Sequence, residues 1–385
     1  MNTEKLDELH KYSVKIRRKL HEYPEIGFDL DRTVGLVSKE LENMGIPYTH
    51  KYGKGSVVAE IGNTGKIVAL RADMDGLPVE EKSNLPYSSK IPGQMHACGH
   101  DSHTAILLAV AKYLKENEKS FPGRVRLIFQ PSEEGAVSGA KMMVDNGVCD
   151  GVDHIICTHC ENTLETGKIG IHYGDYMAAC IPATIRFLGK TSHATLPEFG
   201  IDANAMAVEA YQKMRDMVKE EADQIPYIWS VGKIKGGHVH NVISDLCEMD
   251  ISFRFFDMDF ADRVGKRVKE ICTDIAKKYG GNVEIIWNMS TGPVRNDEKI
   301  LNDFVKIVKS VNLEVEEVPR KMSSEDFGWY LTKVPGMLFR FGTENKRCGK
   351  LTVAHNNDFV IDEDGMKSAI LAFCSYILDI SNFKY

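Results

Sequence analysis

Long apolar runs, an excess of basic residues and regularly spaced cysteines are all missing from this 385-residue sequence. No apolar run approaches the roughly 20 residues that a membrane-spanning helix needs. Lys and Arg total 48 against 55 Asp and Glu, so a net charge of −7 provides no basic face for nucleic acid or an anionic membrane. The N-terminal segment lacks the apolar core of a signal peptide. We therefore expect neither a nucleic-acid nor a membrane partner.

The nine cysteines are odd in number and scattered, without the spacing of a disulfide framework. Reduced thiols of this kind predict a cytoplasmic protein. Cys157 and Cys160 form one CxxC pair, but no second pair follows at zinc-ribbon spacing. A redox role for this pair would require one thiol with a depressed pKa. The sequence also lacks internal repeats, nucleotide-binding glycine patterns and a GxSxG motif, so it offers no support for a Ser-His-Asp hydrolase.

The length exceeds what one hydrophobic core usually holds, which predicts two domains. Strand and helix signals alternate at both ends of the chain, as in an α/β domain with a parallel or mixed sheet. The strand signals lie at 56–61, 67–70, 125–129, 154–157 and 337–341, and the helix signals at 6–20, 34–44, 103–116, 139–145, 300–311 and from 365 onward.

The middle of the chain has a different pattern, in the order β-α-β-β-α-β. This is the arrangement of a ferredoxin-like module. We therefore predict a catalytic domain formed by 1–178 and 290–385, with an inserted ferredoxin-like lid and dimerisation domain at 179–289. An edge strand of such an insertion could pair across a homodimer.

Polar residues follow three predicted strands of the first domain. Asp73 and Asp75 follow the strand at 67–70, Glu133 and Glu134 follow 125–129, and His159 follows 154–157. Ligands of open α/β sheets bind beyond the carboxyl ends of the strands, so these side chains should converge. Carboxylates crowded there would repel one another unless a cation lay between them. The pattern therefore indicates a metal site.

The segment His96–Ala105, HACGHDSHTA, is the densest in metal-binding residue types. It contains His96, Cys98, His100, Asp101 and His103. Thiolate, imidazole and carboxylate together suit zinc, with manganese, cobalt or nickel as alternatives. An isolated histidine is more often structural, but the clustering with strand-end carboxylates favours metal binding here.

At these motifs the sequence resembles the dinuclear-metal amidohydrolases of the aminoacylase and carboxypeptidase G superfamily. The branch it resembles holds hippurate hydrolase-like N-acyl-amino-acid amidohydrolases, N-acetyldiaminopimelate deacetylases and plant auxin-conjugate hydrolases. The matching stretches span nearly the whole chain: IRRKLHEYPEIGF (16–28), RADMDGLPVEE (71–81), MHACGHDSHTA (95–105), IFQPSEEGAVSGA (128–140), GKTSHATLP (189–197), NVI (241–243), SSEDF (323–327) and His355.

The resemblance implies a two-metal centre and a role for each matching residue. The residues that match the metal ligands are Cys98, which would bridge both ions, and His100, Glu134, His159 and His355. Glu133 matches the general base and Asp75 the aspartate behind the site, while Asp73 stands where many relatives have a ligating histidine. His193, Asn241 and Arg254 match inserted-domain positions that look like substrate and transition-state contacts. Closure of the inserted domain would bring these three residues over the metals.

Several positions depart from the pattern of this branch. A short Pro-containing run usually follows the histidine at 159, whereas this chain has CENTLET before Gly167. The late motif reads HNNDF (355–359) in place of the usual HSPxF. These changes leave the ligands in place but weaken any assignment of substrate.

The sequence therefore predicts a metallo-amidohydrolase that cleaves the amide bond of an N-acetyl or aromatic N-acyl amino acid. Glu133 would take a proton from a metal-activated water and pass it to the leaving amine. The alternatives are a dipeptidase or an N-acetyldiaminopimelate deacetylase, and, outside enzymes, a degenerate binding protein.

Overall fold

The computed structural model describes residues 1–62, 64–121, 123–344 and 351–379. The chain divides into two compact units. Unit 1 contains Met1–Tyr176, Val294–Arg320 and Asp326–Tyr385, and unit 2 contains Met177–Pro293 and Lys321–Glu325. Both ends of the chain thus belong to unit 1.

Unit 1 is built on an eight-stranded mixed sheet with the order β1-β2-β4-β3-β5-β14-β6-β13. The strands are β1 (Tyr48–Thr49), β2 (Val57–Ile61), β3 (Ile67–Asp73), β4 (Arg124–Gln130), β5 (Val152–Glu161), β6 (Ile169–Ile171), β13 (Val315–Glu317) and β14 (Gly336–Gly342). The four central strands β4, β3, β5 and β14 are parallel. The carboxyl ends of these four strands therefore meet at one edge of the sheet, where most of the candidate residues lie.

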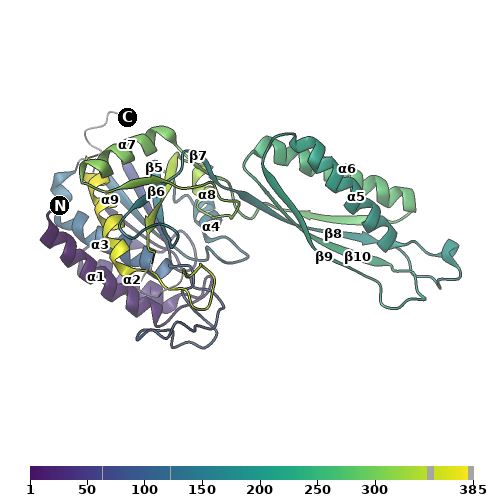
Figure 1. The fold of residues 1–385 in the computed structure, drawn as a ribbon, viewed down its shortest axis with the longest axis horizontal. Coiled ribbons are helices and arrows are strands. Elements are labelled where there is room, and N and C mark those ends of the chain that lie inside the picture. Colours follow the sequence, from purple (N-terminus) through teal and green to yellow (C-terminus); the bar gives the residue numbers. More distant parts are fainter. Residues whose placement is uncertain (63, 122, 345–350, 380–385) are drawn as a thin grey trace. The chain divides into compact units, whose positions relative to one another are not determined.

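The helices of unit 1 are α1 (Thr3–His21), α2 (Asp31–Asn43), α3 (His100–Glu116), α4 (Gly139–Asp145), α7 (Glu298–Ser310), α8 (Gly328–Leu331) and α9 (Met366–Asp379). Helices α1, α3 and α9, from the two ends of the chain, pack against one another (Figure 1). Helix α3 is buried almost all round because it also contacts strands β3 and β5. This packing fixes the first residue of α3, His100, beside the ends of these strands.

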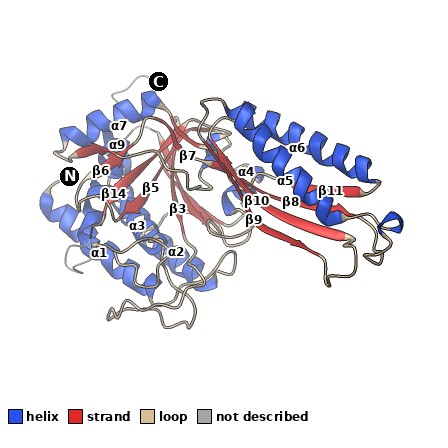
Figure 2. Ribbon diagram, turned by 45° about the vertical axis from the view of Figure 1, so that its right-hand side comes forward, coloured by secondary structure: helices blue, strands red, loops and turns tan. Residues whose placement is uncertain are grey.

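Unit 2 has the element order β8 (Ala179–Leu188), α5 (Ala203–Ala222), β9 (Tyr227–Gly236), β10 (Leu246–Phe255), α6 (Met258–Tyr279) and β11 (Asn282–Trp287). The strands form an antiparallel sheet in the order β11-β8-β10-β9. Both helices cover the same face of this sheet (Figures 1 and 2). Strand β10 alternates buried and more exposed residues, as expected for a sheet with one covered face.

A two-stranded sheet of β7 (Gly174–Met177) and β12 (Val294–Asn296) joins the segments through which the chain leaves and re-enters unit 1. Each unit has its own hydrophobic core. No helix in the described part of the chain is long and apolar enough to cross a membrane.

Candidate metal centre

Asp75 organises the turn that carries the two adjacent glutamates. It follows strand β3, and its carboxylate accepts hydrogen bonds from the backbone N–H groups of Glu133, at 3.0 Å, and Glu134, at 3.1 Å. Ser132, just before them, has a left-handed φ of 50°. Because such a conformation is unfavourable for a residue with a side chain, the turn depends on contacts of this kind to hold it.

His100 presents one ring nitrogen to a group of carboxylates. Its Nδ1–H donates to the carbonyl of Asp75 at 2.9 Å. Its Nε2 has no hydrogen-bond partner among the described residues, and it lies 3.8 Å from Asp73 Oδ2 and 3.9 Å from both Glu133 Oε2 and Glu134 Oε1. Burial by itself lowers the pKa of His100, but the charges of Asp73, Asp75 and Glu134 outweigh it and raise the pKa to about 10. The surroundings of Nε2 thus favour a positive charge.

His159 and Cys98 face each other beside His100. His159 Nδ1 donates to the carbonyl of Cys160 at 2.8 Å, which leaves its Nε2 lone pair 3.3 Å from Cys98 Sγ. Burial, with the nearby charge of Arg340, holds the pKa of His159 well below its ordinary value. The imidazole is therefore neutral, which is the form that binds metals. Burial and the charge of Glu134 raise the pKa of Cys98, so a thiolate there requires a cation beside it.

Gly99 allows this close packing. Its φ is 88°, and a Cβ atom at this position would lie 2.5 Å from Cys160 Sγ. Any other residue between Cys98 and His100 would therefore clash with strand β5 and strain the backbone.

His355 reaches the same cluster from a loop near the C-terminal end of the chain. Its Nε2 lies 3.0 Å from Glu134 Oε1, and its backbone N–H donates to the carbonyl of Ala97 at 2.8 Å. Hydrogen bonding to Glu134 raises the pKa of His355, although partial burial opposes this shift. His355 itself has a left-handed φ of 72°.

Among several overlapping groups of possible ligand atoms, two share Cys98: one consists of Cys98, His100 and His159 and the other of Cys98, Glu134 and His355. Within each set the atoms lie within 4.8 Å of one another. Cys98 belongs to both sets, so its sulfur is placed where one atom could contact two cations. Both buried imidazoles use Nδ1 for a carbonyl and present Nε2, which is the usual arrangement of metal-binding histidines. The donor atoms therefore fit divalent metals.

His103, also close to these sets, is already fully hydrogen-bonded. Its Nδ1–H donates to Asp73 at 2.6 Å, and its Nε2 accepts the backbone N–H of Cys160 at 3.0 Å. The opposite oxygen of Asp73 accepts from Arg71 at 2.7 Å. Burial by itself raises the pKa of Asp73, but the charges of His100, Arg71 and His103 outweigh it and hold this pKa well below its ordinary value. His103 thus supports Asp73 behind the centre.

Asp101 belongs to a separate buried network. His21 Nδ1–H donates to Asp101 at 2.8 Å, while His21 Nε2–H faces Glu81 at 3.2 Å. The guanidinium of Arg17 lies 3.0 Å from Asp101. His96, beside this network, is buried, and neither ring nitrogen has a hydrogen-bond partner among the described residues. Of the dense histidine-rich segment, Cys98 and His100 therefore belong to the two sets that share Cys98, whereas the nitrogens of His103 are used in hydrogen bonds and Asp101 lies in the separate network.

Sequence reasoning gave Asp326 no role, although it is a hub of buried hydrogen bonds. Its carboxylate accepts from the side chains of Arg71, Gln130 and Ser138 and from the backbone of Ala140. Its own backbone N–H points to Glu133 Oε1 at 3.4 Å. The only signal in the sequence was its place in the SSEDF motif.

Unit 2 contains the other three predicted residues. His193 Nδ1 accepts from the hydroxyl of Thr195 at 2.7 Å, so the neutral ring carries its proton on Nε2 and can donate it. The backbone carbonyl of Asn241 accepts from Ala194 at 2.9 Å, which places Asn241 beside His193.

Arg254 lies away from this pair. The segment of His193 and Asn241 lies beside the start of β10, where Leu246 is the first residue. Arg254 is eight residues further along the strand, which corresponds to roughly 27 Å. Its Nη1 donates to the carbonyl of Met322 at 3.1 Å and to Ser324 Oγ at 3.0 Å. The structure therefore pairs His193 with Asn241 and places Arg254 at a separate point of unit 2.

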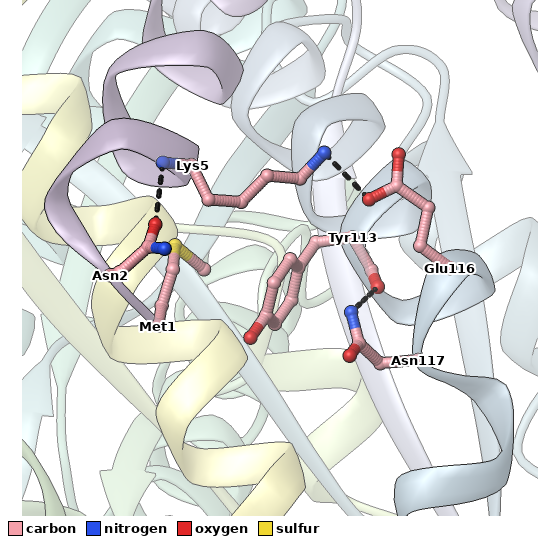
Figure 3. Close-up of a pocket in the computed structure, with 6 residues that line it drawn as sticks. All are labelled: Met1, Asn2, Lys5, Tyr113, Glu116 and Asn117. Atoms are coloured by element: carbon pink, nitrogen blue, oxygen red, sulfur yellow. Dashed lines mark hydrogen bonds and ion pairs between the residues drawn. The ribbon is translucent and has the colours of Figure 1, made fainter.

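A surface pocket of about 470 Å³ lies between the start of α1 and the end of α3 (Figure 3). This is the opposite end of α3 from His100, roughly 25 Å along the helix. Lys5 in this pocket is paired with Glu116 at 2.6 Å, and Asn117 donates to the carbonyl of Tyr113 (Figure 3). Several polar groups of the pocket are thus paired with one another, and the pocket contains none of the candidate residues.

Comparison with known proteins identifies relatives along nearly the whole chain. The family profile "Peptidase family M20/M25/M40" matches residues 69–379. The chain is 35% identical to thermostable carboxypeptidase 2 of Saccharolobus solfataricus, over 97% of each chain. It is 35% identical to N-acetyl-L-cysteine deacetylase of Bacillus subtilis, over 96% of this chain and 88% of the relative. The structure of the YXEP protein of Bacillus subtilis, described as a dinuclear metal binding peptidase, matches with a TM-score of 0.84 and 30% identity, over 98% of this chain and 99% of the other.

Proposed function

The chain belongs to peptidase family M20/M25/M40 and is a metallo-amidohydrolase, and we propose from this that it cleaves N-acyl amino acids at a two-metal centre. The observation that supports the proposal most directly is the pair of ligand sets that share Cys98. The YXEP protein is described as a dinuclear metal binding peptidase, which agrees with the two ions proposed for this chain.

In this proposal Cys98, His100 and His159 hold one ion, and Cys98, Glu134 and His355 hold the other. The thiolate, imidazole and carboxylate donors suit Zn, Mn, Co or Ni. Bound metal would supply a water molecule with a pKa near 7 and would polarise the scissile carbonyl.

Glu133 is the proposed general base. Its Oε2 faces the same space as His100 Nε2, and its Oε1 lies near the backbone N–H of Asp326. From this position the carboxylate would accept a proton from the attacking water and deliver it to the leaving amine. Asp75 would act indirectly, because its carboxylate holds the turn on which Glu133 stands.

We propose that unit 2 is a ferredoxin-like lid, which its β8-α5-β9-β10-α6-β11 order supports. His193, with its proton on Nε2, would donate to the developing oxyanion, and Asn241 would lie beside it. Arg254 would pair with a substrate carboxylate. Pairing of two lids in a homodimer and a location in the cytoplasm are further parts of the proposal. The cytoplasmic location agrees with the buried thiols that the structure describes.

A specific observation also favours peptides as substrates, since one relative is named a carboxypeptidase. A dipeptidase would use the same ligands and base, and it would differ in what the lid recognises. N-acetyldiaminopimelate deacetylation is a second variant of the same chemistry.

The deciding experiment measures metal content together with hydrolysis. The protein is stripped with a chelator, reconstituted with Mn²⁺ or Zn²⁺, and assayed with N-acetyl-methionine, hippurate, simple dipeptides and N-acetyldiaminopimelate. About two ions per chain with metal-dependent release of amino acid from an N-acyl substrate would support the proposal. Turnover of dipeptides alone would replace it with the peptidase alternative. Two bound ions without any turnover would contradict the catalytic role.

A further inference from the structure

Asn162 makes a compact set of buried hydrogen bonds directly beside the proposed centre. It is the first residue after β5, the strand that contains His159, and its exposed fraction is 7%. Its Nδ2 donates to the carbonyl of Thr352 at 2.9 Å, to Thr352 Oγ1 at 3.0 Å and to the carbonyl of Val360 at 2.9 Å. Its Oδ1 accepts from Thr343 Oγ1 at 2.6 Å. One amide thus joins three separate parts of unit 1.

Two of these parts are the ends of the loop that carries His355. Thr352 begins the loop and Val360 ends it, and the two are also joined directly. Thr352 Oγ1 donates to the carbonyl of Val360 at 2.9 Å and accepts the N–H of Val360 at 3.1 Å. The third part, Thr343, follows β14, which pairs with β5. The loop is therefore closed at its base and fixed to the sheet by Asn162.

His355 needs this support. It is in the left-handed region, and its side chain is 55% exposed, so little packing surrounds the imidazole. A left-handed non-glycine residue persists only where its surroundings hold it. The contacts that do so include the hydrogen bond to Ala97, the hydrogen bond from the N–H of Lys82 to the carbonyl of Asn357 at 2.6 Å, and the closed base of the loop.

We propose that Asn162 is a positioning residue, which fixes the loop 352–360 so that His355 meets the metal beside Glu134. The inference rests on the proposed function, because it assigns His355 as a ligand. It extends that proposal to a residue within CENTLET, the stretch in which this chain departs from the Pro-containing run of similar sequences.

The test compares Asn162→Asp with a matched control, Asn296→Asp. Asn296 is also buried in unit 1, where it donates to the carbonyls of His172 and Leu338 and accepts the N–H of Leu338. In both variants a carboxylate oxygen replaces the donor and faces carbonyl oxygens. Only Asn162 is connected to the loop of His355.

Binding of Mn²⁺ and Zn²⁺ to the stripped proteins is followed by calorimetry and by metal analysis after dialysis. We expect the weaker of the two ions to bind about 10–100-fold less tightly to Asn162→Asp, the usual effect of losing a residue that orients a ligand. Asn296→Asp should lose thermal stability and retain wild-type metal affinities. Amide hydrogen exchange in 352–360 should accelerate in Asn162→Asp and remain unchanged in the control.

Two further variants complete the test. If Asn162→Asp does not fold, Thr352→Val removes the hydroxyl at the base of the loop and leaves Asn162 in place; it should show a smaller shift in the same direction. In a His355→Ala background, Asn162→Asp should weaken metal binding by less than twofold, because the ligand through which it acts is missing. Unchanged metal affinity, or an equal loss in the His355→Ala background, would overturn the inference. None of these measurements uses a substrate, so a failed hydrolysis assay leaves the test intact.

Discussion

Asp75→Asn should damage the centre although Asp75 contacts no ligand atom of the two sets. Its two carboxylate oxygens each accept a different backbone N–H, one from Glu133 and one from Glu134. An asparagine can present only one oxygen, so its NH₂ group must face the second N–H. One charge-assisted hydrogen bond is lost, and a buried donor is left without an acceptor.

The expected cost follows from these contacts. Losing a hydrogen bond to a charged group costs about 1.5–3 kcal/mol, and the repulsion between the asparagine NH₂ group and the backbone N–H adds to this cost. We therefore expect the free energy of unfolding to fall by about 2–4 kcal/mol. Asp297→Asn is the matched control, because both N–H groups that cap α7 donate to the same oxygen of Asp297. Asparagine caps a helix about as well as aspartate, so this control should change stability by less than about 0.5 kcal/mol.

The measurements are denaturant unfolding of the stripped proteins and amide exchange at Glu133 and Glu134. Asp75→Asn should lower the unfolding midpoint and accelerate exchange at these two amides, whereas Asp297→Asn should do neither. With metals restored, kcat should fall about 10–100-fold. Equal stability and equal exchange in the two variants would refute the argument that Asp75 holds the turn.

Three other variants test the remaining roles. Glu133→Gln should keep metal content and stability while kcat falls about 10²–10⁴-fold, and near-normal turnover would exclude Glu133 as the base. Cys98→Ser should lower the number of bound ions measured by metal analysis, since a hydroxyl is a poorer ligand than a thiolate; full occupancy would contradict the bridging assignment. Burial opposes ionisation of Glu81, but hydrogen bonds from His21 and Ser83 outweigh it and lower the pKa of Glu81 to about 2 from 4.5. The carboxylate therefore stabilises the fold above pH 4.5 and loses this effect as the pH falls toward 2. Glu81→Gln should be less stable than wild type by about 1–3 kcal/mol at pH 7, with the difference shrinking below pH 4.5 in urea titrations; a difference independent of pH would be inconsistent with this pKa.

The convergence of the strand-end residues could be predicted because parallel strands end at one edge of a sheet. The sequence placed Asp73 and Asp75 beyond one strand and Glu133 beyond another, and the structure brings the three to one edge, with Asp73 as the last residue of β3. The prediction that His159 follows its strand was less accurate, since β5 continues to Glu161 and contains His159. Polar residues at the end of a buried strand interrupt the apolar pattern, so the strand predicted from this pattern is shorter than the real one.

Other features depend on contacts between distant segments and left no local pattern. Helix α3 begins at His100, three residues before the apolar periodicity indicated, because Gly99 turns the chain there. The spacing of the histidines in the sequence could not distinguish His103 from His100. Both ring nitrogens of His103 are hydrogen-bonded, whereas the buried Nε2 of His100 faces the carboxylates without a hydrogen-bond partner among the described residues. Asn162 acts through residues almost 200 positions away, which no reading of one sequence could reveal.

The pair Cys157 and Cys160 shows how burial decides between alternatives. Both are buried thiols on strand β5. Burial raises the pKa of Cys160, which is the opposite of what a redox-active thiol requires. The sequence motif alone left this question open.

Strand β14 lies inside the sheet, between β5 and β6, although it comes late in the chain, and this order affects when the centre can form during translation. Four of the five proposed ligands have been translated once residue 159 has left the ribosome tunnel, but His355 follows 196 residues later. At about 5–20 residues per second, this interval lasts roughly 10–40 s. During that time the growing chain contains Cys98, His100, Glu134 and His159 but lacks both His355 and strand β14 of the sheet. The five-ligand centre can therefore be completed only late in translation, after both β14 and His355 have emerged.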